Sequence, residues 1–238
     1  MSHNRPCCLC SQIQGDPTND LIAAMLPDQP YVQRVLFESE TFAAIPSLGP
    51  LAPGHSLLCP KAHINSFAES DRCFDADFLA AKRDLRRILT SLYDSPVHLF
   101  EHGMASKGTR ILCTVDHAHL HFLPLPGPSF AQIPAIDGRW DAFAGSPQQL
   151  RELADGNEYI LYEAPDGRSC ILRASAETLE SQYMRKLFAK WIGQEESWDW
   201  RETPNAALAD EAWRRFVRFS RGGNRLRGES VWAGSASS

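Results

Sequence analysis

Hydrophobic and polar positions alternate most clearly at the middle of the chain. Histidines occupy every second position of this segment and apolar residues stand between them: His117, Ala118, His119, Leu120, His121, Phe122 and Leu123. Successive side chains of a β-strand point to opposite faces of its sheet. The pattern therefore predicts a strand that carries the histidines on one face and packs the other face into a core, and Pro124 marks its end.

The rest of the chain reads as an alternation of short strands and helices. Strands are predicted at 31–37, 41–45, 56–60, 97–100, from 110 into the histidine segment, at 159–163 and at 170–173. Helices are predicted around 21–26, from 70 or 71 to about 92, at 176–193 and at 205–219. The longest helix has an apolar stripe at helical spacing, and an Asp-Gly pair at 166 and 167 indicates a hairpin turn. The segment 124–147 is rich in Pro and Gly and is expected to be mostly irregular.

Composition and charge limit the classes of protein that fit. The 238 residues are 43% hydrophobic and 22% charged, which are values typical of a globular protein. The net charge of -5 argues against general nucleic-acid binding, which usually needs a basic surface. No apolar run approaches the length of a membrane span, and the N-terminus lacks the apolar core of a secretion signal. We therefore expect a cytoplasmic protein that binds neither membranes nor nucleic acid.

Cysteine spacing indicates a site near the N-terminus. Of the seven cysteines, Cys7 and Cys10 form a C-x-x-C pair. Such a pair can present two thiolates to a tetrahedral zinc ion, or it can be a redox pair. Cys8 lies between them and is a competing ligand. The remaining cysteines are isolated and are interpreted as small buried side chains.

Three motifs in order along the chain carry a resemblance to a known family. They are Cys7-x-x-Cys10, the run Pro53-Gly54-His55 with the following Pro60-Lys61-Ala62-His63, and the segment from His117 to Leu123. Over roughly residues 7–125 the chain resembles the histidine triad (HIT) family, whose signature alternates three histidines with apolar residues. The resemblance implies an α+β fold, with an antiparallel sheet of about five strands packed on a long helix, usually in a homodimer. We expect a HIT domain at 1–125, a C-terminal extension at 126–220 and a disordered tail at 221–238.

The resemblance also implies a mechanism. In HIT enzymes the middle histidine attacks the α-phosphorus of a nucleotide, and water or another acceptor then resolves the nucleotidyl-histidine. Carried over, His119 is the nucleophile, His121 donates to the phosphate oxygens, and His55 orients or supports His121. The chain is then a nucleotide hydrolase or nucleotidyltransferase.

A structural zinc is the second implication. In HIT relatives with an N-terminal C-x-x-C, two cysteines and two histidines hold the ion. The matching residues here are Cys7, Cys10, His63 and His117. The alternative is that the two cysteines are unliganded thiols.

Several positions depart from the family pattern, and they concern the substrate. Ser47, followed by Leu48, stands where many HIT hydrolases have a ribose-binding Asp. Thr114 keeps a hydroxyl where the family usually has Gly-Gln-Ser/Thr, but the Gln is missing, and Glu101 stands where the family has Asn. We expect these four residues to bind substrate, which could be an adenosine phosphoramidate, a diadenosine polyphosphate, a nucleotide sugar, or a cytidylyl or other activated metabolite.

Two other classes of function stay open at this stage. His117, His121 and Glu101 could form a two-histidine, one-carboxylate site for a catalytic metal. Alternatively, the protein could be a nucleotide-binding regulator with little turnover. In the extension, one of Gln182, Arg185 and Arg201 could bind the leaving group or its phosphate, although each could equally be a solvated surface residue.

Overall fold

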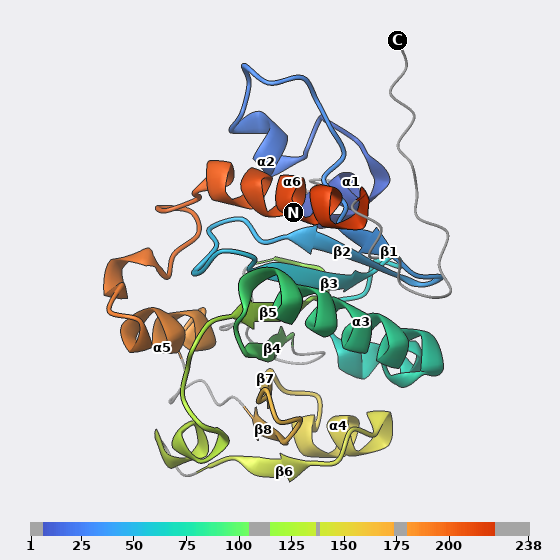
Figure 1. Ribbon diagram of the computed structural model, residues 1–238. Helices are drawn as coiled ribbons and strands as arrows, with labels where there is room; N and C mark the ends of the chain where they lie inside the picture. Colours follow the sequence, from blue (N-terminus) through green and yellow to red (C-terminus); the bar gives the residue numbers. More distant parts are fainter. Residues whose placement is uncertain (1–6, 105–114, 137–138, 174–179, 222–238) are drawn as a thin grey trace, which may run out of the picture.

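The protein is built around one antiparallel sheet with helices packed on it, as the computed structural model in Figure 1 shows. The structure describes residues 7–104, 115–136, 139–173 and 180–221. Its eight-stranded sheet has the order β1-β2-β3-β5-β4-β7-β8-β6, and all of its strand pairs are antiparallel. The strands are β1 Phe37–Glu38, β2 Phe42–Pro46, β3 Ser56–Pro60, β4 Val97–Gly103, β5 Leu120–Pro124, β6 Asp141–Phe143, β7 Tyr159–Glu163 and β8 Ser169–Arg173.

Helices cover both faces of this sheet. The α-helices are α1 Cys8–Gln14, α2 Leu21–Ala24, α3 Ala76–Tyr93, α4 Pro147–Ala154, α5 Tyr183–Trp191 and α6 Ala206–Arg221. Short 3-10 helices are η1 Phe67–Glu69, η2 Asp71–Phe74, η3 Phe130–Gln132, η4 Pro134–Ile136 and η5 Glu195–Ser197. The predicted α+β fold is confirmed, with eight strands in place of about five.

Strand alternation divides the core into layers. One face of the sheet, which includes Leu99 and Phe122, packs against the long helix α3. The opposite face divides in two: Phe100 and its neighbours pack against α5, and the β2–β3 side packs against α1. The space between α1 and α5 on this second face is lined by His102 of β4, by His121 of β5 and by His119, which directly precedes β5.

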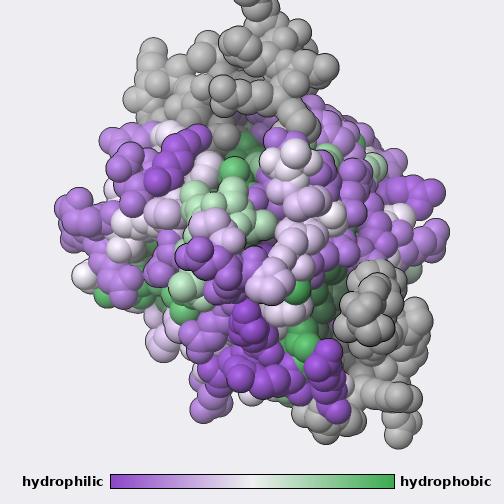
Figure 2. Space-filling model, turned by 90° about the horizontal axis from the view of Figure 1, so that it is seen from above, coloured by the Kyte–Doolittle hydropathy of each residue, from purple (hydrophilic) through white to green (hydrophobic). Residues whose placement is uncertain are grey.

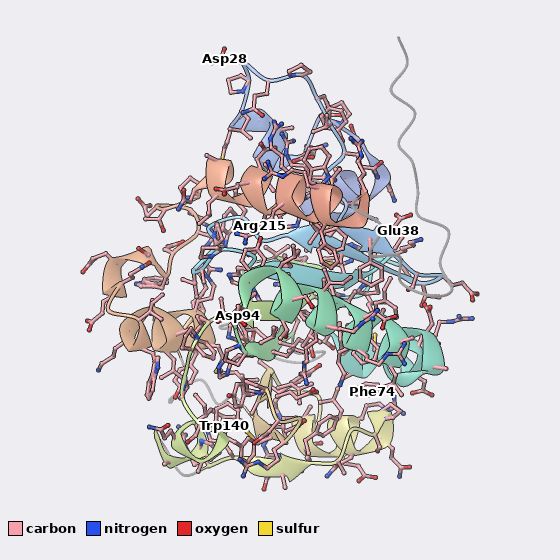
Figure 3. All side chains as sticks on the ribbon, viewed as in Figure 1. Asp28, Glu38, Phe74, Asp94, Trp140 and Arg215 are labelled. Carbon is pink, nitrogen blue, oxygen red and sulfur yellow. The ribbon has the colours of Figure 1, made fainter. Side chains whose placement is uncertain are left out.

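The C-terminal segment is built into the same sheet. Strand β7 pairs with β4 along five residues, so the extension continues the sheet at the edge of the expected HIT core. Helix α6 returns across the chain to contact β2, α2 and α3 (Figure 1). Arg215 of α6, labelled in Figure 3, lies over the Tyr93 ring at 4.8 Å and donates to the Leu92 carbonyl at the end of α3. The domain boundary at residue 125 stays a prediction.

Several element predictions need correction. The predicted strand at 31–37 begins only at Phe37, and the histidine strand begins at Leu120, so only His121 of the three histidines lies within it. Helix α5 begins at Tyr183, seven residues later than predicted, and α1, α4 and β6 were not predicted. Residues 110–114, 176–179 and 222–238, to which the predicted strand start, helix start and tail were assigned, lie outside the described residues.

The side seen from above in Figure 2 is mostly hydrophilic around a few hydrophobic residues. Within the described ranges, no helix combines the length and the apolar composition needed to span a bilayer. A homodimer and a cytoplasmic location stay predictions.

Candidate active site

The first group of predicted residues comes together as a cluster of sulfur and nitrogen ligands. Cys7 and Cys10 at the start of α1 meet His63, which follows β3, and His117, which precedes β5, with all four ligand atoms within 4.8 Å of one another. The Cys7 Sγ and Cys10 Sγ atoms lie 3.5 and 3.3 Å from His117 Nδ1, and Cys10 Sγ lies 3.4 Å from His63 Nδ1. Sulfur and nitrogen ligands of one tetrahedral zinc are about 3.5 Å apart. The four residues therefore fit a metal ion.

Backbone carbonyls orient the first two histidines of the triad. His117 Nε2 lies 2.9 Å from the Pro60 carbonyl oxygen and must donate to it, because a carbonyl only accepts. Its Nδ1 is then unprotonated and faces the cysteines as a ligand. His119 Nδ1 lies 2.7 Å from the His117 carbonyl oxygen and donates to it, which leaves a lone pair on His119 Nε2.

A chain of hydrogen bonds orients the third histidine. The Leu51 N–H donates to His55 Nδ1 at 3.2 Å, so in the neutral ring the proton of His55 is on Nε2. That Nε2–H donates to His121 Nδ1 at 2.9 Å, which in turn places the proton of His121 on its own Nε2. The His121 ring stacks on Phe100 with centroids 4.3 Å apart, and this contact restricts its rotation.

Burial keeps these rings neutral. It lowers the pKa of His119 below the ordinary value of 6.5 and that of His55 and His121 well below it, because a charged ring would lose its hydration. The positive charge of Arg185 lowers the pKa of all three further. At neutral pH His119 therefore offers a lone pair and His121 offers a hydrogen-bond donor.

A pocket with about 690 Å³ of empty space, part of it open to solvent, joins these groups. Its walls come from α1, α2, the end of β2, β3, β4 and the extension, and both His119 and His121 line it. From the extension come Gln182, Arg185 and Trp200. Among the described residues that line the pocket, Arg185 is the only one with a full charge.

The predicted substrate-binding residues do not all reach this pocket. Ser47 and Leu48 line it. Glu101 does not: alternation along β4 turns its carboxylate to the α3 face, where it accepts from the Phe67 N–H and the Tyr159 hydroxyl, each at 2.8 Å. Burial raises the pKa of Glu101 to about 8. Thr114 lies outside the described residues.

The positions of these side chains also exclude the alternative of a catalytic metal held by His117, His121 and Glu101. Glu101 lies on the opposite face of the sheet from His121, and the ligand nitrogen of His117 belongs to the cluster with the cysteines. A site composed of these three side chains is therefore not formed.

Sequence reasoning missed several pocket residues, among them His102 and Gln12, and left Arg185 as one of three candidates. His102 lines the pocket and accepts from the Met184 N–H at 3.2 Å, which links β4 to α5. Gln12 lines it from α1, which was not predicted as a helix. Arg185 was one of three candidates in the extension; Arg201 instead lies over the Trp200 ring, outside the pocket lining. The alternation of β4, in which Phe100 and His102 share a face, was the available signal for His102.

Comparison with solved structures yields several histidine triad proteins. A HIT family member from Bacillus subtilis is 19% identical, with a TM-score of 0.37, over 62% of this chain and 94% of that one. A Zn-bound histidine triad family protein from Mycobacterium smegmatis is 19% identical, with a TM-score of 0.33, over 52% and 78% of the two chains. A hypothetical histidine triad nucleotide-binding protein from Sulfolobus tokodaii is 14% identical, with a TM-score of 0.32, over 86% and 97%.

No protein-family model matches the sequence, and no curated protein matches it. All three TM-scores are below 0.5, so the chemistry of the site rests on its own geometry. The chain is similar to histidine triad proteins, as its three motifs predict.

Proposed function

We propose that the protein is a nucleotide hydrolase or nucleotidyltransferase in which His119 is the nucleophile. One observation carries this proposal: the His117 carbonyl holds the Nδ1 proton of His119, so the lone pair on Nε2 is free in a pocket. Neutral imidazole is a good nucleophile near neutral pH. A fixed tautomer removes the need to reorganise the ring before attack.

The reaction proceeds in two displacements at one phosphorus atom. His119 Nε2 attacks the α-phosphorus, a P–N bond forms, and the bond to the leaving group breaks, with the electron pair departing on the leaving oxygen or nitrogen. In the second displacement an acceptor oxygen, from water or another molecule, attacks the phosphorus and the P–N bond breaks. The acceptor releases its proton to solvent, a leaving nitrogen takes one up from solvent, and His119 regains its lone pair.

His121 stabilises the charge that develops on the phosphoryl oxygens. Its Nε2–H is the donor, and its direction depends on the hydrogen bonds from Leu51 through His55. Such pre-oriented donors contribute most in the transition state, where the negative charge is greatest. His55 is accordingly a positioning residue that acts through His121.

The rest of the pocket suits a nucleoside. Apolar side chains of α1 and α2, including Leu9 and Ile22, line the same pocket as His119 and offer a surface to a base. Ser47 and Leu48 lie at the end of β2 beside them, where a hydroxyl and an apolar group can contact a ribose. We assign these residues to nucleoside binding.

We assign a structural zinc ion to Cys7, Cys10, His63 and His117. A closed set of four ligands, two thiolates and two imidazoles, is typical of structural zinc sites. Bound there, the ion would join α1 to the segments beside β3 and β5. His117 then has two roles: its ring is a ligand, and its carbonyl holds the proton of His119.

Turnover of a nucleotide panel tests the proposed function. Nucleoside phosphoramidates, dinucleoside polyphosphates and nucleotide sugars are offered to the wild type and to His119→Gly. We expect turnover only by the wild type, with partial rescue of His119→Gly by added imidazole, which can occupy the vacated space. His98→Asn is the control, because His98 is buried and bonded to the Tyr162 hydroxyl on Nδ1, away from the pocket lining. Tight nucleotide binding with no turnover would instead favour a regulator.

A further inference from the structure

Arg185 is an unusual residue for a protein interior. It projects from α5, its side chain is only 3% exposed, and it lines the pocket that contains His119. Its Nε donates to the Trp198 carbonyl at 2.7 Å and one terminal nitrogen, Nη2, donates to the Gly49 carbonyl. Among the described residues the other terminal nitrogen, Nη1, has no hydrogen-bond partner.

No carboxylate of the described residues neutralises this guanidinium. Within the described part of the chain, no Asp or Glu oxygen lies within 4.0 Å of an Arg185 nitrogen. Asp199 influences Arg185 only at longer range, and its carboxylate lies 3.4 Å from the Gln182 amide nitrogen and 3.8 Å from Arg201. Burial lowers the pKa of Arg185 to about 10, so the group is still charged at neutral pH. An unpaired buried charge is costly, and an anionic ligand would offset that cost.

The N-terminus of α5 adds a second, independent feature. Gln182 precedes the helix with φ +59, a left-handed conformation that is unfavourable for a residue other than Gly. Its side chain is 97% buried, and its Oε1 has no hydrogen-bond partner. Helix α5 has nine residues, and although its Met184 N–H already donates to His102, the dipole of the helix favours negative charge near its N-terminus.

We propose that Arg185 and the N-terminus of α5 bind a second phosphate group, next to the phosphorus that His119 attacks. The substrate is then a phosphoanhydride, in which a nucleoside monophosphate unit is joined through oxygen to another phosphate. A simple phosphoramidate carries only the attacked phosphate and would leave Arg185 unpaired. The assignment of one phosphate to His119 and the other to Arg185 rests on the proposed function, whereas anion binding by Arg185 does not.

The assignment fits the balance of charge in the first displacement. The P–N bond to His119 forms as the P–O bond to the second phosphate breaks, and the electron pair leaves on that bridging oxygen. Arg185 neutralises the charge that appears there, in a pocket where burial strengthens the interaction. Gln182 Oε1, which only accepts, can bind a hydroxyl on the group attached to the second phosphate.

Binding of nucleoside mono- and diphosphates tests the proposal without requiring turnover. Calorimetry with AMP, ADP and inorganic pyrophosphate is performed on His119→Asn protein, and then on the same protein carrying Arg185→Met, Arg185→Lys or Arg201→Gln. Arg201→Gln is the matched control, since it removes one positive charge from the extension at a side chain that lies outside the pocket. One charge-assisted hydrogen-bonded pair corresponds to roughly tenfold to a hundredfold in affinity.

We expect ADP to bind at least about tenfold more tightly than AMP, and Arg185→Met to bring the two affinities within about twofold. Arg185→Lys keeps the charge but not the planar fork, so an intermediate ratio is expected. If Arg185→Met does not fold, the ratio of ADP affinity to AMP affinity is compared between Arg185→Lys and the parent protein, and an unchanged ratio overturns the proposal. An unchanged ratio in Arg185→Met, or equal affinities in the parent protein, would also overturn it.

The outcome is separable from that of the proposed function. Arg185-dependent pyrophosphate and ADP binding in a protein without His119-dependent turnover would support the anion site and reject the nucleophile. A nucleotidyl-His119 adduct together with an Arg185-independent affinity ratio would do the reverse.

Discussion

Replacing His55 by asparagine or by glutamine separates the two hydrogen bonds that this buried side chain makes. Asparagine has its amide near the position of Nδ1 and can still accept from the Leu51 N–H, but it does not reach His121. Glutamine reaches the position of Nε2 and can still donate to His121 Nδ1, but it releases Leu51. The two variants therefore have similar burial and differ in which neighbour loses its partner.

The structure gives expected magnitudes for both variants. Each leaves one buried polar atom without a partner, which costs about 1–3 kcal/mol of unfolding free energy. Only His55→Asn frees His121 Nδ1 to take up the proton and so removes the donor at Nε2. Loss of one such donor lowers kcat by about 10²–10³. We therefore expect similar losses of stability, with kcat retained within about tenfold in His55→Gln alone.

Urea unfolding, steady-state kinetics and ¹⁵N chemical shifts of the His121 ring provide the three readouts. The shifts report directly which ring nitrogen carries the proton. Equal losses of kcat in the two variants, with the His121 tautomer unchanged in both, would refute the orientation of His121 through His55.

Three further predictions concern other parts of the molecule. Burial raises the pKa of Glu101 from its ordinary value of 4.5 to about 8, so the stability that this group contributes is present below pH 4.5 and is lost as pH rises through about 8. The unfolding free energy of the wild type, measured relative to that of Glu101→Gln, should therefore fall over this range by on the order of 5 kcal/mol at most. Gly49→Ala should lower the Tm more than Gly145→Ala does. Both glycines have positive φ, but only at Gly49 would an added Cβ lie 2.4 Å from the Cβ of Trp200. Equal losses of Tm would contradict this packing. Cys10→Ser should abolish the stoichiometric zinc measured by elemental analysis and lower the Tm, and unchanged zinc content would reject the ligand assignment.

The elements that sequence patterns predicted well are those with strong local signals. Strand 56–60 and the hairpin around Asp166 and Gly167 agree with the structure, because an apolar run and a turn pair are sufficient to define them. The prediction of a strand at 31–37 was wrong, because a β-rich composition does not say where pairing begins, and strand β1 begins only at Phe37. Helix α4 was missed because its Pro147, which suits the first turn of a helix, was interpreted as part of an irregular segment.

The site shows the same limit at the level of contacts. The resemblance to the histidine triad family grouped the four metal-ligand candidates, and the structure brings them together. Alternation along β4 already places Glu101 and His102 on opposite faces, but which of the two faces carries His121 is set by the pairing of β4 with β5, and this pairing was not available from the local sequence. The position of Arg185 depends on how the extension folds back over Gly49, a contact across more than a hundred residues that no local pattern encodes.

The central claim is that His119 forms a covalent bond to the α-phosphorus of a nucleotide. It is tested most directly by the intact mass of the protein after brief mixing with nucleotide phosphoanhydrides and nucleoside phosphoramidates. The protein is quenched at neutral or alkaline pH, because the P–N bond of a phosphohistidine is labile in acid. We predict a transient mass increase of one nucleotidyl group, which is a nucleoside monophosphate less one water, in the wild type, located on His119 and absent from His119→Gly. Turnover by the wild type with no such adduct, or an adduct that persists in His119→Gly, would contradict the account.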